Sequence, residues 1–336
     1  MPGPVCYALG GTEPTVTDAN LVLGRLSAER FLGGDMRLDA AAARAVIERS
    51  IATPLEISIE AAAEGIVRIA AATMSSVVKR VTTERGLDAR DFPMVAFGGA
   101  GPLHATLVAR ELHIGTVIIP PAPGHFSAFG MLVADLRRDF VRTLFVPLAA
   151  IDFDALEQVF RAMESEGERD VASVAGEHGA PIASRALDMR YVGQEHAVTV
   201  EIPIEAFRNR DPAAIKAAFD RVHTQRYGYC SATEQAEIVS VRASVSGALE
   251  KPELPLLASG SAEPPADASS GSRPVYFSSR GGWVDAPTWR RDRLLAGNRV
   301  TGPALIEEYA STTVLAPGDQ LTVDRFGNLV IEINHD

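Results

Sequence analysis

The sequence predicts an α/β domain followed by an α+β domain that is rich in β-strands. Up to about residue 137, amphipathic helical patterns alternate with short apolar runs, which is typical of helices packed on a sheet. From Arg138 onward strand-like alternation dominates, and turn residues separate several short apolar runs after Val275. We therefore expect two domains, 1–137 and 138–336, with the Pro-, Ser- and Ala-rich stretch at about 253–272 as a long surface loop.

The N-terminal part is predicted to be mainly helical. A short helix is expected to follow Asp18 or Thr17, either of which is a suitable N-cap because its side-chain oxygen can accept a free N–H. An alanine-rich helix is expected from Ala40 to Ile51. The most regular helical pattern begins after Ser58, another expected N-cap, and stops at Gly86.

The stretch from Pro93 to Ile119 is predicted to form a strand, a glycine loop, a helix and a second strand. An apolar run at Met94–Phe97 leads into the loop at 98–101, and Pro102 then opens the helix. Glycines allow a positive φ and a close approach of the backbone to another group. The loop therefore presents N–H groups beside a helix N-terminus, an arrangement that suits a nucleotide or another anion.

The remainder is predicted to combine a stiff turn at Pro120–His125, an apolar helix at Phe126–Leu136, and further strands and helices. The expected strands lie at Asp139–Pro147, Ala186–Gln194, Ala197–Ile202, about Ile238–Val245, Val275–Phe277, Ala304–Glu308, Thr312–Leu315, Gln320–Val323 and Leu329–Ile333, and the expected helices at Phe153 to about Val174 and Pro212–Arg226. The closely spaced strands after Val275 suggest a small β-rich unit.

Composition and charge argue against several classes of protein. The net charge of −11 and the absence of a dense Lys/Arg stripe argue against nucleic acid as a partner. No apolar run of about 18 residues indicates a transmembrane helix, and no leader sequence is recognisable. The two cysteines, Cys6 and Cys230, lie in different segments and do not indicate a disulfide framework. We expect a cytoplasmic protein without a membrane or nucleic-acid partner.

Individual reactive residues give little indication of chemistry. None of the seven histidines lies in a spacing that would assemble a metal site locally, so no metal ligand is assigned. His104, one turn into the helix after the glycine loop, could contact a ligand or act as an acid/base, but packing on the strand explains it at least as well; His125 is similar. Cys6 has no neighbouring His and is expected to be a small apolar residue. No Gly-x-Ser-x-Gly motif supports a serine hydrolase.

The glycine loop does not match the common nucleotide motifs. A dinucleotide fold would place Gly or Ala where His104 stands, and an acidic residue at the end of the next strand, where Pro120 and Pro121 follow. No Gly-Lys-Ser/Thr follows the loop, so the Walker pattern is absent as well. Two interpretations stay open: a tight strand-to-helix turn, and a loop that holds a nucleoside or its phosphates through backbone N–H groups.

Several motifs spread over nearly the whole chain are specific as a set. They are Gly3-Pro-Val-Cys-Tyr, Gly10-Gly, Pro14-Thr-Val-Thr-Asp-Ala-Asn-Leu-Val-Leu-Gly-Arg-Leu, Phe31-Leu-Gly-Gly, Val95-Ala-Phe-Gly-Gly-Ala-Gly-Pro-Leu-His-Ala, Pro120-Pro-Ala-Pro-Gly, Ser127-Ala-Phe-Gly-Met-Leu-Val-Ala-Asp, Arg190-Tyr-Val-Gly-Gln, Arg226-Tyr-Gly-Tyr and Gly302-Pro-Ala-Leu-Ile-Glu-Glu-Tyr-Ala-Ser-Thr-Thr. Together they resemble the hydantoinase A/5-oxoprolinase family.

This resemblance implies a fold and a cofactor. Family members include ATP-dependent hydrolases of cyclic amides, such as hydantoins, 5-oxoproline and lactams, and subunits of acetone and acetophenone carboxylases. Their ATP-handling part is similar to the actin-like (ribonuclease H-like) fold, so the first domain is expected to be a partial lobe of that fold. The glycine loop of the family holds the adenosine side of ATP, which carries over to Gly98, Gly99, Ala100 and Gly101. ATP and Mg²⁺ are the implied cofactors of the complete enzyme.

The resemblance also implies protein partners and a substrate. Family members carry an N-terminal lobe and a phosphate loop upstream of the Gly3-Pro-Val-Cys-Tyr motif, so the chain is expected to be the C-terminal half of such a subunit. The expected partners are that missing N-terminal half, a hydantoinase B-like subunit and a small cyclic amide, in a hetero-oligomer. Without the other lobe we expect no ATP hydrolysis and no ring opening. The catalytic residues stay unassigned.

Two alternatives stay open beside an ATP-dependent cyclic-amide hydrolase. One is a non-catalytic nucleotide-binding or assembly module that docks its partner through the region from Arg138 onward. The other is a subunit of an acetone- or acetophenone-carboxylase-like enzyme, which would act on a ketone with ATP and bicarbonate.

Overall fold

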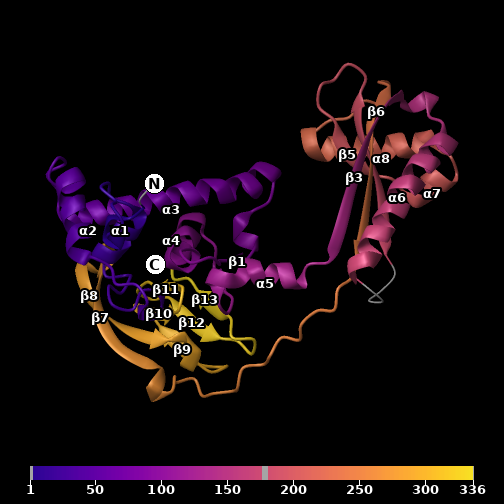
Figure 1. Cartoon of the computed structure of the whole chain (residues 1–336). Coiled ribbons are helices and arrows are strands. Elements are labelled where there is room, and N and C mark those ends of the chain that lie inside the picture. The colour runs from indigo at the N-terminus through magenta and orange to yellow at the C-terminus, as the bar shows by residue number, and fades with distance from the viewer. Residues whose placement is uncertain (1–2, 176–180, 336) are drawn as a thin grey trace. The chain divides into compact units, whose positions relative to one another are not determined.

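The chain forms two compact units in a computed structural model that describes residues 3–175 and 181–335 (Figure 1). The first unit comprises Met1–Gly130 and Glu253–Asp336, and the second comprises Met131–Pro252. This division differs from the expected one at residue 137/138, because the C-terminal strands pair with the sheet of the glycine loop. The segment after Glu253 is therefore not a separate β-rich unit.

Three α-helices form the N-terminal part of the first unit. Ser58 caps the longest of them as expected, since its Oγ accepts a hydrogen bond from the Ala61 N–H at 3.1 Å. Gly86, with a φ of 78°, follows the last turn. The helices and turns are α1 Val16–Val22, α2 Ala40–Ile47 with a π-turn at Glu48–Ala52, α3 Ile59–Val81 and a 3₁₀ turn at Thr83–Arg85.

Asp18 is not the N-cap of α1, and neither is Thr17. Thr15 caps the helix, and Asp18 lies at the third helical position, where the two residues form a reciprocal capping box. The Asp18 carboxylate is completely buried and accepts hydrogen bonds from the backbone N–H groups of Cys6 at 2.8 Å, Thr15 at 2.9 Å and Val5 at 3.2 Å. Asp18 therefore ties the N-terminal loop to α1, which sequence spacing alone did not indicate.

The sheet beside the glycine loop contains strands from both ends of the chain. β1 (Met94–Val95) lies parallel to β2 (Thr116–Ile119), with α4 (Gly101–Leu112) between them in sequence. The strand–loop–helix–strand prediction is confirmed, although the first strand is shorter than expected. The sheet continues antiparallel from β2 to β13 (Leu329–Glu332) and has the order β1-β2-β13-β12-β9, with β12 at Gln320–Val323 and β9 at Arg299–Thr301.

A second sheet of the first unit has the order β11-β10-β8-β7, in which β8 and β10 are parallel. Its strands are β7 Ser269–Phe277, β8 Gly282–Arg290, β10 Ala304–Glu308 and β11 Ser311–Leu315. The sequence did not predict β8 or β9, whose alternation is weak. One apolar cluster joins α4 to strands of both sheets; its members include Ala105, Val108, Val117, Ile306, Leu315 and Ile331. The helix that follows the glycine loop is thus fixed by strands from the far end of the chain.

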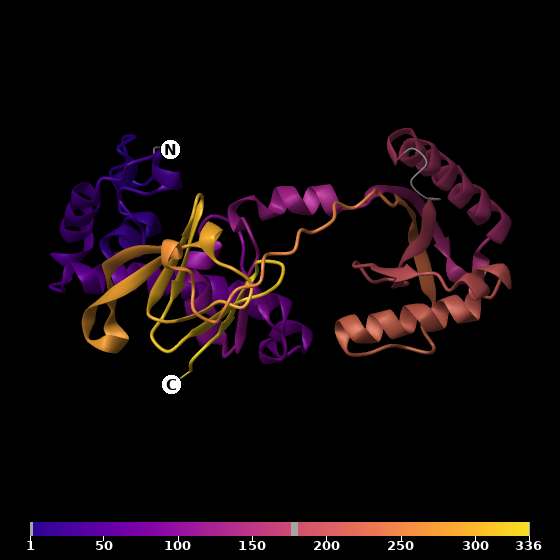
Figure 2. The ribbon, with the colours of Figure 1, turned by 90° about the horizontal axis from the view of Figure 1, so that it is seen from below.

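The second unit is a four-stranded antiparallel sheet with helices packed on one face (Figure 2). The sheet order is β3-β6-β4-β5. The elements are β3 Leu136–Pro147, α6 Phe153–Ala175, β4 Ile182–Tyr191, β5 Val198–Glu201, α7 Ile204–Arg208, α8 Pro212–Tyr227 and β6 Ala236–Gly247. Phe160 of α6 and Phe219 of α8 are completely buried in the same cluster as Met189 of β4 and Ile238 of β6. Apart from the short α7, which was not predicted, these elements match the predicted strands and helices of this region, and the mixed α/β class is confirmed.

α3 is the element whose composition comes closest to that of a membrane span. The helical stretch Ile59–Arg85 is long enough, and an 18-residue window has a mean hydropathy of 1.3. Its buried side chains, among them Ala63, Val67 and Ala71, lie in the clusters of the first unit, and the helix contacts α1, α2 and α4. Only 28% of that window is buried, and Ile69, Val77 and Val81 are exposed, so packing within the first unit covers only part of the apolar surface of α3.

The buried carboxylate of Asp18 yields a stability prediction. Burial raises its pKa, but the hydrogen bonds from Cys6 and Thr15 outweigh this, so the pKa lies below the usual value. Asp18→Asn should lower the free energy of unfolding of the first unit by about 2 kcal/mol at pH 7, because a buried acceptor is lost. Urea unfolding at a series of pH values measures this.

The pH series shows whether the stabilisation by Asp18 is gained or lost as the pH falls. A carboxylate with a depressed folded-state pKa stabilises the fold above its unfolded pKa, and this contribution is lost as the pH falls through the folded pKa. The difference in the free energy of unfolding between the wild type and Asp18→Asn should therefore be largest at pH 7 and become smaller below about pH 4. Asp39→Asn is the matched control, because Asp39 caps α2 from an exposed position and Asn is an equally good cap. Equal losses in both variants would contradict the role given to Asp18.

Candidate nucleotide site and a buried polar cluster

The glycine loop joins β1 to α4 and is exposed at Gly99 and Ala100. The Gly98 N–H donates to the carbonyl oxygen of Pro123 at 2.7 Å, which ties the loop to the neighbouring Pro-rich turn. Within residues 3–175 and 181–335, the N–H groups of Gly99, Ala100 and Gly101 have no acceptor, and Gly99 and Ala100 are exposed. These groups sit at the positive end of the α4 dipole. The loop therefore offers three donors to an anionic or nucleoside ligand.

The three glycines of the loop differ in whether backbone conformation or packing requires a glycine. Gly98 has a φ of 87°, which L side chains rarely adopt. A Cβ on Gly99 would lie 3.2 Å from the carbonyl oxygen of Ala310, so the β10–β11 turn packs tightly on the loop. A Cβ on Gly101 would meet nothing closer than 3.8 Å, the carbonyl carbon of Ala96. Since neither φ nor packing demands Gly101, this position is the best probe of a bound ligand.

The described surroundings of the loop form a wall that is hollowed beside Gly99. Beside Gly99 lies a hollow of about 40 Å³, bordered by Tyr309 and Ala310, whereas small-molecule sites are usually about 300–1,000 Å³. The wall is held by Arg291, which donates to Glu308 at 3.2 Å and to the carbonyl oxygen of Ile119 at 2.9 Å. Burial lowers the pKa of Arg291 and raises that of Glu308, as expected for an ion pair away from water. A nucleotide on this loop would need a second wall.

The reactive residues near the loop are mostly structural. His104 is buried, with its Nε2 3.4 Å from the Asn20 Nδ2 of α1, and burial together with the charge of Arg25 lowers its pKa to about 4. The imidazole is therefore neutral at pH 7. Cys6 is buried and free of a disulfide, and burial together with a side-chain hydrogen bond to Asp18 raises its pKa to about 12, so the thiol is protonated at pH 7. His125 is exposed at the end of the Pro-rich turn.

The described residues do not assemble a metal site. In the ranges 3–175 and 181–335, no three His, Cys, Asp or Glu side chains are grouped so that they could hold a metal ion. His178, one of the seven histidines considered from sequence, lies outside these ranges. Mg²⁺ stays an implication of the family resemblance for the complete enzyme.

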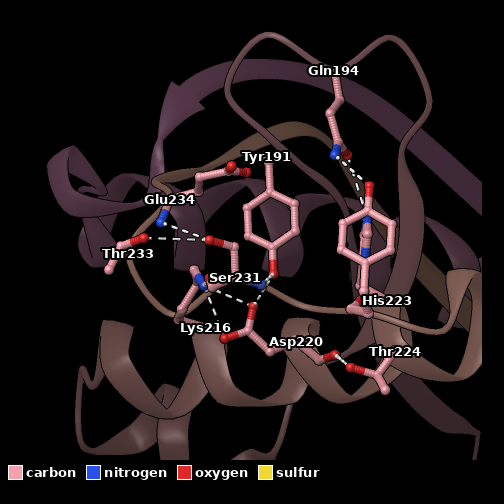
Figure 3. Close-up of polar contacts among 10 residues, drawn as sticks. Tyr191, Gln194, Lys216, Asp220, His223, Thr224, Ser231, Thr233 and Glu234 are labelled. Carbon is pink, nitrogen blue, oxygen red and sulfur yellow. Dashed lines mark hydrogen bonds and ion pairs between the residues drawn. The ribbon is translucent and has the colours of Figure 1, made fainter.

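A dense polar cluster lies in the second unit, between β4 and α8 (Figure 3). The Tyr191 hydroxyl donates to Asp220 Oδ1 at 2.7 Å and accepts from the Ser231 N–H at 2.7 Å. Lys216 donates to both oxygens of Asp220, at 2.7 and 2.9 Å, and to the Ser231 carbonyl oxygen at 2.9 Å. Burial raises the pKa of Tyr191 to about 12. Every polar group of this core has a partner, as expected for a structural network.

His223 completes the cluster from the next turn of α8. Its Nδ1 lies 2.8 Å from the Tyr229 carbonyl oxygen and its Nε2 lies 3.4 Å from Gln194 Oε1. The rings of Tyr191 and Tyr227 flank it, with centroids 4.8 and 4.7 Å away. The motifs 190–194 and 226–229, singled out from the sequence, therefore meet at one buried histidine. They fasten the loop after α8 to the end of β4.

Comparison with known proteins places this arrangement in a family. The family model described as Hydantoinase/oxoprolinase matches residues 1–140, and the model described as Hydantoinase/oxoprolinase C-terminal domain matches residues 152–332. The chain belongs to the hydantoinase/oxoprolinase family. The resemblance drawn from the motifs is thereby confirmed, and the two models divide the sequence close to the expected boundary even though the last strands of this hydantoinase/oxoprolinase chain fold back onto the first unit.

Three relatives of this hydantoinase/oxoprolinase chain illustrate the family. The caprolactamase subunit alpha of Pseudomonas jessenii is 36% identical over 96% of this chain and 47% of its own length. The crystal structure of ATP-dependent caprolactamase from the same organism matches 99% of this chain and 49% of that chain, with a TM-score of 0.82 and 34% identity. A nucleotide-free structure of acetone carboxylase matches 98% and 48%, with a TM-score of 0.79 and 26% identity. The chain thus spans about half the length of these relatives.

Some functional features of this family member were readable in the sequence and others were not. The glycine loop and the spacing of Lys216 and Asp220, four apart on a helix, are local signals. The contact between Gly99 and Ala310 joins residues more than two hundred positions apart, and no local pattern indicates it. No local pattern indicates the buried position of Arg25 beside His104 either.

The polar cluster of the second unit leads to a stability prediction. Tyr191→Phe leaves the partly buried Ser231 N–H without its acceptor, so the second unit should lose about 1–2 kcal/mol. Hydrogen exchange of the β4 and β6 amides and urea unfolding together measure this loss of unfolding free energy. Tyr229→Phe is the control: its hydroxyl is exposed and takes only a 3.2 Å hydrogen bond from Gln194, so a change within about 0.5 kcal/mol is expected. If Tyr191→Phe costs no more than the control, the network does not stabilise the unit.

Proposed function

We propose that this chain supplies the adenosine-side wall of the nucleotide site in an ATP-dependent cyclic-amide hydrolase. The observation that carries the proposal is the set of three N–H groups at Gly99, Ala100 and Gly101 that have no acceptor among the described residues and lie at the N-terminus of a buried helix. Family membership and the similarity to an ATP-dependent caprolactamase support the same function. Bound ATP would supply the phosphoryl group that activates the ring amide towards water.

The role of this chain in that reaction is to bind and orient. The backbone N–H groups accept no proton and release none, so they contribute position and positive potential rather than acid/base chemistry. Arg291, Glu308 and the β10–β11 turn keep the loop rigid, because the turn contacts Gly99 and Arg291 binds the strand that precedes the Pro-rich turn. Catalytic side chains would come from a second lobe and from a hydantoinase B-like partner in a hetero-oligomer, acting in the cytoplasm.

The first test concerns turnover. The chain alone should not hydrolyse ATP, with or without caprolactam, because the hollow beside Gly99 is too small to enclose the nucleotide. Added polypeptide corresponding to the other half of the family's longer subunits should restore ATP hydrolysis that depends on the cyclic amide. Steady-state phosphate release measures both. ATP turnover with caprolactam by the chain alone would refute the two-wall proposal.

The second test concerns the loop itself. In the assembled enzyme, Gly101→Val should weaken ATP binding by at least about tenfold, because its side chain would occupy the space of the ligand. The fold should tolerate the variant, since nothing lies closer than 3.8 Å to the added Cβ. Gly115→Val, at the other end of α4 and equally open, is the matched control. Fluorescent-nucleotide titration measures affinity and thermal unfolding checks the fold. Unchanged affinity in Gly101→Val would remove the loop from the site.

A carboxylase subunit is the second candidate, favoured by the similarity to acetone carboxylase over 98% of the chain. The reconstituted enzyme separates the two candidates by the compound that stimulates ATP hydrolysis. Caprolactam without bicarbonate supports the hydrolase, whereas acetone or acetophenone with bicarbonate supports the carboxylase. An assembly module without catalysis would bind its partner and respond to neither.

A further inference from the structure

Arg25, which follows α1, is a buried cation with unused hydrogen-bonding capacity. Its side chain is 4% exposed, and its Nε and Nη1 atoms have no acceptor among the described residues. Its backbone is fixed on both sides, since the Arg25 N–H donates to the Asn20 carbonyl oxygen at 2.9 Å and the Arg25 carbonyl oxygen accepts from Arg273 at 3.0 Å. Unpaired donors of a buried guanidinium are costly, which indicates that a partner normally meets them.

A pocket of about 510 Å³ opens beside Arg25 within the first unit. Its volume falls in the range of small-molecule sites. Its walls come from α3, α4, the turn after β7 and the end of β11; the lining residues are Arg25, Glu64, Arg68, Leu103, Thr106, Leu107, Arg110, Phe277, Ser278, Ser279, Val314, Ala316 and Pro317. We call it the Arg25 pocket. It lies along the face of α4 that carries Leu103, Leu107 and Arg110, and none of the four glycine-loop residues lines it.

The charges of the Arg25 pocket favour an anion. Three arginines and one glutamate line it. Arg110 is already paired with Asp319, and Glu64 accepts a hydrogen bond from Ser278 Oγ at 2.5 Å. Among the described residues, neither Arg25 nor the exposed Arg68 forms an ion pair, although the charge of Glu64 acts on Arg25 and raises its pKa. With Arg110 paired, these two arginines and Glu64 leave one positive charge in excess. Burial lowers the pKa of Arg25 to about 10, so it is still charged at pH 7.

The remaining lining of the Arg25 pocket favours a ligand that is more than a bare ion. Leu103, Leu107 and Phe277 provide an apolar wall, whereas Ser279 and Thr106 add hydroxyl groups. A planar guanidinium can donate two parallel hydrogen bonds to a carboxylate or phosphate. A neutral ligand would leave those donors unmet, and a cation would be repelled.

We propose that the Arg25 pocket binds a small molecule whose oxyanion group, a carboxylate or a phosphate, meets Arg25 and Arg68 while its apolar body lies against Leu103, Leu107 and Phe277. The site is distinct from the glycine loop and does not depend on the function proposed for it. An acidic side chain of a partner protein is the competing occupant. The apolar wall formed by Leu103, Leu107 and Phe277 favours the small molecule, because a single carboxylate would leave that wall uncovered.

The test follows the Arg25 side chain by NMR during titration of the full chain at pH 7. The Nε–H resonance of Arg25 is assigned as the one lost in Arg25→Met. The probes are inorganic phosphate, acetate and hexanoate. We expect a saturable shift, with hexanoate effective at a concentration at least about tenfold below that of acetate, because its methylene groups bury against the apolar wall. Saturation by phosphate at lower concentration than by hexanoate would identify a phosphate ligand, and the reverse order a carboxylate.

Variants locate the ligand in the Arg25 pocket. If Arg25→Met does not fold, the Arg25 resonance is assigned instead by selective labelling and by its proximity to His104. Arg68→Met, at an exposed position on α3, should weaken hexanoate binding about three- to tenfold. Arg80→Met, on the same helix and outside the pocket, should leave it unchanged. Gly101→Val should also leave it unchanged, which separates this site from the nucleotide site.

Two results would overturn the proposal. One is the absence of a saturable shift of the Arg25 resonance with any of the three probes. The other is a shift that only the added second-lobe polypeptide produces, since Arg25 would then serve a protein interface. If hexanoate bound no more tightly than acetate, the proposed contact between an apolar ligand body and the apolar wall would be wrong.

Discussion

The antiparallel pairing of β13 with β2 is the contact on which the candidate site depends. It places Leu329 opposite Ile119 and Ile331 opposite Val117, and so joins the C-terminal strands to the strand that follows α4. Because of this pairing, the β10–β11 turn can reach Gly99 and Arg291 can bind the strand before the Pro-rich turn. Without it, the glycine loop would be an isolated strand–helix connection with neither of these supports.

The two polar clusters show how differently buried charge is used in the two units. In the second unit, Tyr191, Lys216 and Asp220 satisfy one another, so the network contributes rigidity and has no capacity left for a ligand. In the first unit, the buried Arg25 and His104 have nitrogen atoms without a partner among the described residues. Complete pairing is characteristic of structural networks, whereas unpaired buried donors are where a ligand or partner is expected.

The sequence predicted local features well and long-range ones poorly, for a physical reason. Helix α3 and its cap at Ser58, the strand–loop–helix motif and most strands follow from periodicity, turn residues and capping preferences, which act within a few positions. Asp18 was misassigned because a buried capping box and an exposed N-cap share the same residue types. The return of β12 and β13 to the first sheet, and with it the wall behind the glycine loop, arises from pairing across more than two hundred residues.

The insertion of residues 131–252 between the two parts of the first unit has a consequence for the order in which the chain folds during synthesis. The second unit is continuous, so all of its strands leave the ribosome before Glu253 does, and it can fold while translation continues. The first unit cannot complete its five-stranded sheet until β13, which follows the whole of the second unit in the sequence, has emerged. Until then β2 is an unpaired edge beside exposed apolar side chains, a state prone to aggregation. The unit that begins first is therefore the one that folds last.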